Sequence, residues 1–153
     1  MQVKDSKVKA QEKIIDVHWS SVWIGFGIAI IGTLILGALA FQAVENVWLI
    51  ALGGELSLLV GGAVAALRAQ TSPALNGAFI GLLYFTVTVI IIFGGVMTET
   101  LPDPLPGLPK GDSTFFFVWP LAQVLASTLG AVIGARATTA SRRRKTRPPA
   151  KGK

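Results

Sequence analysis

The sequence predicts an all-α fold, an integral membrane bundle of four transmembrane helices arranged as two antiparallel hairpins. Three observations predict it. Hydrophobic residues make up 52% of the chain and charged residues only 14%, whereas a soluble domain has about 25% charged residues. Four apolar stretches each reach the length of about 20 residues that crosses a bilayer. The connection between the first two stretches is short, which makes their helices an antiparallel pair.

The four helices belong to one predicted transmembrane domain, residues 18–137. Their expected spans are about 19–41, 47–68, 73–97 and 115–136. Trp19 and Trp23 open the first span, and tryptophan prefers the headgroup level. Pro73 suits the first turn of the third helix. The Ala38-Leu39-Ala40 motif would also fit a signal-peptide cleavage site, but the apolar run is too long for a typical h-region, which favours an uncleaved helix.

Polar segments flank this domain. Residues 1–17 are interpreted as a polar cytoplasmic tail, and residues 138–153 as a basic tail that is expected to be disordered, because it cannot bury a core. The proline-rich loop 98–114 should be extended rather than helical. Of the 14 Lys and Arg residues, only Lys110 lies in this loop. The positive-inside rule therefore predicts a multi-pass protein of the plasma membrane with both termini cytoplasmic.

The ends of the second and fourth helices resemble each other. Residues 62–69, GAVAALRA, align without gaps on residues 130–137, GAVIGARA. We therefore expect two hairpin repeats related by an axis along the membrane normal. The alternative is a chance similarity between two apolar sequences.

Small residues recur at helical spacing. The third helix contains Gly77-x-x-x-Gly81 and the fourth contains Gly130-x-x-x-Gly134, both of the GxxxG type. No hydrophobic force drives helices together in lipid, so small residues matter because they let backbones approach closely. These four glycines are therefore the predicted helix-packing positions.

Glu55 places a carboxyl group in the middle of the second helix, where ionisable residues are rare and suggest function. One interpretation is a proton or cation site. The other, which we favour, is a neutral Glu that hydrogen-bonds across helices and fixes their register. At 1.5 Å per residue, Glu55 lies about 15 Å and Gln123 about 12 Å below the outer ends of their helices. We expect these two side chains to pair, with Thr33 and Thr88 near the same depth.

Other chemistry has little support in the sequence. The chain has no cysteine and one histidine, which excludes a thiolate site and a His-based metal cluster. The chain also lacks HExxH, GxSxG and Walker A motifs. The sequence therefore predicts a protein that is not an enzyme and that holds no metal or cofactor.

Basic residues gather at the cytoplasmic side. We expect them to contact anionic lipid headgroups in preference to nucleic acid. They are Arg68, Arg136, Arg142, Arg143, Arg144, Lys145 and Arg147.

One segment carries a family resemblance. Residues 55–85, ELSLLVGGAVAALRAQTSPALNGAFIGLLYF, resemble the central segment of a family of small four-helix bacterial membrane proteins of unknown function. The shared features are a Gly-Gly near the end of helix two, a short basic turn, and a Gly-x-x-x-Gly-Leu-Leu-Tyr-like start to helix three. The match covers about a fifth of the chain, and the turn departs from the pattern by inserting Thr71-Ser72-Pro73. The resemblance implies the architecture only.

The expected function is a non-enzymatic accessory subunit or scaffold. It would pack against other membrane protein subunits, or against a second copy of itself, through glycine-rich helix faces. A small oligomeric transporter or channel, with Glu55 as an intramembrane ion or proton site, is the alternative. A third possibility is a lipid-binding regulatory protein that acts through the basic tail.

Overall fold

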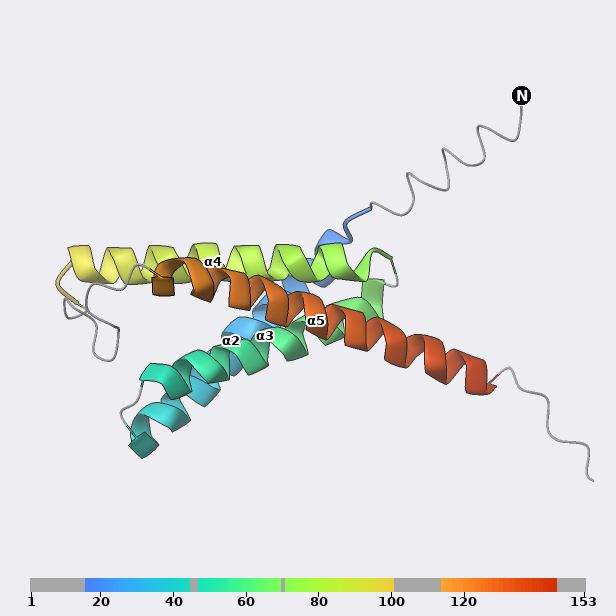
Figure 1. Cartoon of the computed structure of the whole chain (residues 1–153), viewed down its shortest axis with the longest axis horizontal. Coiled ribbons are helices and arrows are strands. Elements are labelled where there is room, and N and C mark those ends of the chain that lie inside the picture. Colours follow the sequence, from blue (N-terminus) through green and yellow to red (C-terminus); the bar gives the residue numbers. More distant parts are fainter. Residues whose placement is uncertain (1–15, 45–46, 70, 101–113, 146–153) are drawn as a thin grey trace, which may run out of the picture.

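The computed structural model describes residues 16–44, 47–69, 71–100 and 114–145, and the regular structure in these residues is helical throughout. The helices are α2 (Trp19–Val44), α3 (Val47–Ala69), α4 (Pro73–Met97) and α5 (Thr114–Lys145) (Figure 1). Each contains a stretch that is long and apolar enough to cross a membrane. The predicted all-α four-helix membrane bundle is therefore confirmed. Most of the predicted amino-terminal tail and outer loop, and residues 146–153, lie outside the described residues.

The fourth helix is longer than predicted, and the expected disordered tail is wrong for residues 138–145. Helix α5 continues to Lys145, nine residues beyond the predicted end at Arg136. Adding residues to an existing helix avoids the cost of nucleation, and this extension is rich in Ala, Arg and Lys, which are strong helix formers. The hydroxyl groups of Thr138 and Thr139 donate hydrogen bonds back to carbonyl groups of the preceding turn.

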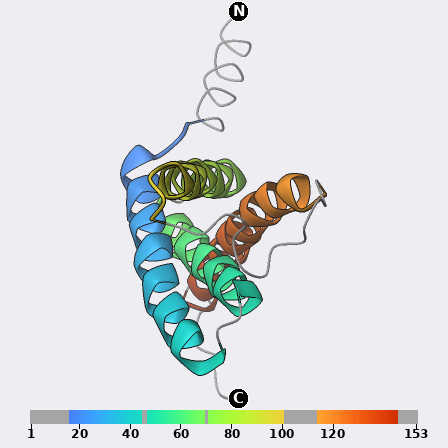
Figure 2. The same cartoon turned by 90° about the vertical axis from the view of Figure 1, so that its left-hand side faces the viewer.

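The four helices form two hairpins joined at their centres. Helices α2 and α3 pair, α4 and α5 pair, and α3 also packs extensively on α5. Helices α3 and α5 run in the same direction and cross, separating toward the end of the bundle where the chain turns back within each hairpin (Figures 1 and 2). The predicted two-fold repeat does not extend to the outer helices. Helix α4 contacts α3, whereas α2 and α5 make no contact within the described residues.

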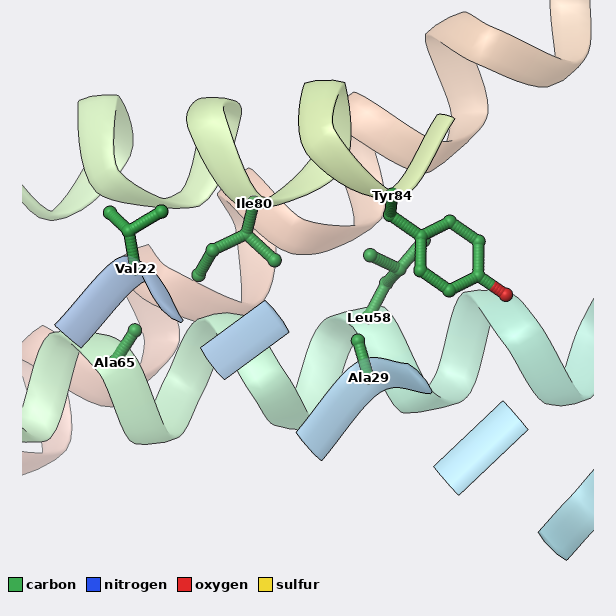
Figure 3. Packing of buried hydrophobic residues seen from close by; sticks show 6 residues of the cluster. All are labelled: Val22, Ala29, Leu58, Ala65, Ile80 and Tyr84. Atoms are coloured by element: carbon green, nitrogen blue, oxygen red, sulfur yellow. The ribbon is translucent and has the colours of Figure 1, made fainter. Parts of the chain in front are cut away.

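The buried apolar core lies between α2, α3 and α4 (Figure 3). Its members are Val22, Ala29, Leu58, Ala65, Ile80 and Tyr84. Many larger apolar side chains point outward instead; Leu34, Ile90 and Phe93 are each about two-thirds exposed. A small buried core with many large apolar residues on the outside is the arrangement expected where lipid surrounds the bundle.

A polar clamp joins the start of α2 to the start of α4. The backbone N–H of His18 donates to Oδ1 of Asn76 at 3.0 Å, and Nδ2 of Asn76 donates to the carbonyl of Thr71 at 2.8 Å. Asn76 is fully buried. Ser72 adopts φ 40° just before Pro73, which begins α4. The clamp holds the two helix starts together at one end of the bundle.

Candidate functional site

The predicted packing glycines lie where helices approach most closely. A Cβ atom on Gly130 would meet the carbonyl of Leu59, and one on Gly134 would lie 2.5 Å from the carbonyl oxygen of Ala63, so both glycines face α3. A Cβ on Gly77 or Gly81 would come within 2.9 Å of α5. Such separations leave no room for a side chain. All four glycines are therefore used for contacts within the chain.

Glu55 and Gln123 lie at matching levels on α3 and α5. Glu55 is seven residues before Gly62, and Gln123 is seven residues before Gly130. Gly62 meets the carbonyl of Ser127, so the two glycines belong to the crossing of α3 and α5. Both polar residues are thus about 10 Å from this crossing, at a rise of 1.5 Å per residue.

The predicted hydrogen bond between Glu55 and Gln123 is wrong. Oε2 of Glu55 and Oε1 of Gln123 are both buried, and neither has a hydrogen-bond partner within the described residues. The physical reason is the crossing geometry, because α3 and α5 separate on the side of the crossing that holds these two residues (Figure 2). Equal depth therefore does not by itself produce a hydrogen bond between the two side chains.

A different interhelical hydrogen bond forms near this level. The hydroxyl of Tyr84 on α4 donates to Oγ1 of Thr33 on α2 at 2.8 Å, and Thr33 donates to the carbonyl of Ala29 in its own helix. Gly54 on α3 makes room for the phenol, since a Cβ there would lie 3.0 Å from the Tyr84 oxygen. Sequence reasoning missed this pair. The available signal was that Tyr84, the only tyrosine, lies one turn after Gly81 on a face that packs inward.

The helices surround a partly open cavity of about 270 Å³ at this level. Thr33, Thr88 and Gln123, three of the four predicted polar candidates, lie in its wall, together with Tyr84 and Trp119. Glu55 does not line it. The remaining wall is aliphatic and comes from α2, α3 and α4. The cavity is partly open. Its polar side chains are therefore spread around the wall and do not form a continuous hydrogen-bond network.

The predicted lipid-contacting residues lie at the opposite end of the bundle. Arg68, in the last turn of α3, and Arg136 on α5 are exposed. Arg136, Pro73 and Thr139 contribute to a shallow hollow of about 470 Å³. The backbone of Arg142, Arg143, Arg144 and Lys145 belongs to α5, and Arg147 lies outside the described residues.

Among the described residues, no group of three or more His, Cys, Asp or Glu side chains could hold a metal ion. Comparison with protein-family models, curated proteins and solved structures finds no match to this chain. The resemblance of residues 55–85 to small bacterial four-helix membrane proteins therefore stays a prediction.

Proposed function

We propose that this chain is a non-enzymatic accessory subunit or scaffold of the plasma membrane, which packs against other membrane proteins or against a second copy of itself. One observation carries the proposal. No atom of the described residues lies within 4 Å of the place where a Cβ would lie on Gly27 of α2 or Gly94 of α4, unlike at the glycines of the helix crossings. A glycine inside a helix costs about 1 kcal/mol relative to alanine. A glycine that is open in this way fits a place where the backbone of another helix docks closely, and α2 and α4 each offer one such place.

The experiment that tests this proposal is purification of the native protein in mild detergent. We expect a stoichiometric partner, or a defined homo-oligomer. Gly27→Leu and Gly94→Leu should weaken that association while leaving the thermal stability of the single chain unchanged. The matched internal variant Gly81→Leu should instead unfold the bundle, because Gly81 faces α5 at close range. Recovery of a monomer alone, or full association of both outward variants, would contradict the proposal.

Orientation and lipid contact are part of the same proposal. Both termini are proposed to be cytoplasmic, because nearly all the basic residues lie on that side. Arg68, Arg136 and the basic end of α5 would contact anionic headgroups, each charge contributing about 1 kcal/mol near the surface.

A transporter or channel is the second candidate, and Glu55 favours it. This partly buried carboxyl group has an unpartnered oxygen inside a membrane-spanning helix, where polar groups usually find partners. Reconstitution in liposomes would separate the candidates. A transport role requires ion or proton flux that Glu55→Gln abolishes without affecting folding. A scaffold role requires no flux and tolerance of the same substitution.

A further inference from the structure

The cavity between the two hairpins has a polar base and an apolar rim. Gln123 and Tyr84 are almost completely buried, with 1% and 5% of their surfaces exposed, whereas Leu34 and Ile91 at the same cavity are more than 60% exposed. The polar groups thus lie deepest, and the aliphatic side chains lie toward the surrounding lipid. A ligand that enters from the lipid would therefore contact aliphatic side chains first and hydrogen-bonding side chains last.

The amide of Gln123 has unmet hydrogen-bonding capacity at this base. Its Oε1 atom is buried and has no hydrogen-bond partner in the part of the chain that the structure describes, although nearly all buried polar atoms in proteins are hydrogen-bonded. A primary amide carries two donor hydrogens and an acceptor oxygen. A hydroxyl group, which both donates and accepts, complements an amide of either orientation.

The lining of the cavity, whose volume is about 270 Å³, selects among occupants. Buried water needs two to four polar partners for each molecule, and most of this wall is aliphatic. A hydrocarbon chain fits both the volume and the wall, since a dry cavity of about 150 Å³ already holds benzene.

We infer that this cavity binds one hydrocarbon chain with a terminal hydroxyl group, an uncharged membrane lipid whose O–H bonds the Gln123 amide and whose chain lies along α2 and α4. The inference does not depend on the proposed scaffold function, because it concerns a ligand within one chain. Thr88, also in the wall, offers a second hydroxyl close to the same base.

The fluorescence of Trp119, which lines the cavity, provides the test. The full chain, with Trp19, Trp23 and Trp48 replaced by Phe, is reconstituted in phosphatidylcholine vesicles. A long-chain alcohol brominated near its hydroxyl end is added as the quencher. We expect saturable quenching of Trp119. A control carrying Trp119→Phe and Leu125→Trp, with the new tryptophan on an exposed face of α5, should show only linear quenching by the bulk lipid.

Two further comparisons test the hydroxyl and the cavity. The methyl ether of the same alcohol and the variant Gln123→Leu should each weaken binding about threefold to tenfold, the loss expected for one hydrogen bond. Ala51→Phe, which fills the cavity, should abolish saturation, and it keeps the test decisive if Gln123→Leu fails to fold. Equal binding of alcohol and ether, linear quenching of Trp119, or unchanged saturation in Ala51→Phe would each overturn the inference.

Discussion

Gly62 and Gly130 make reciprocal contacts across the crossing of α3 and α5. A Cβ on Gly62 would meet the carbonyl of Ser127, and a Cβ on Gly130 would meet the carbonyl of Leu59. Gly62 and Gly130 are 68 positions apart in the sequence, and so are Leu59 and Ser127. Each helix therefore presents the same surface to the other, as in the self-complementary interface of a symmetric dimer. The two segments that align without gaps, residues 62–69 and 130–137, begin at these two glycines.

Adding a methyl group at either glycine should weaken the bundle. Gly62→Ala and Gly130→Ala each place a Cβ against backbone that cannot rotate away, which we expect to cost about 1–3 kcal/mol of unfolding free energy. Thermal unfolding in detergent, followed by circular dichroism, measures the effect. Gly27→Ala is the matched control, because the site is open, and it should be neutral or slightly stabilising. Equal losses at all three positions would show that the close contact at Gly62 and Gly130 does not set the cost.

The Tyr84–Thr33 hydrogen bond should contribute modestly to stability. Interhelical hydrogen bonds in membranes average about 0.6 kcal/mol. Tyr84→Phe and Thr33→Val remove the bond from either side, and a double-mutant cycle isolates the interaction between them. We expect a coupling energy of about 0.5–1.5 kcal/mol in unfolding titrations. Strictly additive effects would mean that the two hydroxyl groups do not interact.

Asn76 should be more sensitive than any hydroxyl on the lipid-facing surface. Asn76→Leu removes the hydrogen bonds to the His18 N–H and the Thr71 carbonyl, which are part-buried, and a typical hydrogen bond contributes about 0.5–1.5 kcal/mol. Faster hydrogen exchange at the His18 amide, together with a lower unfolding free energy, is the expected result. Thr86→Val serves as the control, because the exposed Thr86 hydroxyl donates to the Leu82 carbonyl in its own helix. Protection of His18 that survives Asn76→Leu would exclude the clamp.

Topology can be tested with two exposed positions at opposite ends of the bundle. The chain has no native cysteine, so Thr100→Cys and Ala140→Cys each introduce a single thiol. An impermeant maleimide should label Thr100→Cys in intact cells, and Ala140→Cys only after the cells are lysed. The reverse pattern would place both termini outside.

Much of the fold could be predicted because lipid imposes simple rules. Apolar length and Pro73 together predicted the bounds of α4, residues 73–97, as the structure has them. The end of α5 was missed because hydropathy marks where lipid ends, whereas the helix ends where its backbone hydrogen bonds end. Ala137 and the basic residues after it do not continue the apolar stretch, but they do continue the helix.

The candidate site was only partly predictable. Depth could be counted along each helix, and it placed Thr33, Thr88 and Gln123 around one cavity. A hydrogen bond between Glu55 and Gln123 depends on the angle at which α3 and α5 cross. Residue positions along either helix alone do not give that angle. Tyr84 reaches Thr33 because Gly54 on a third helix leaves space, and such three-body relationships do not appear in local sequence patterns.

Because α5 is long, a small change in the angle at which it crosses α3 near Gly130 moves its carboxyl end by several ångströms. Its 32 residues extend about 48 Å, well beyond a hydrocarbon layer of about 30 Å, and its final turns project past the other helices (Figure 1). Lys145 lies 15 residues from Gly130, an arm of about 22 Å. A swing of about 10° about the crossing therefore moves the basic end by roughly 4 Å at that rise per residue. A change in the packing of the helices at the crossing would thus displace the positive charge at the end of α5.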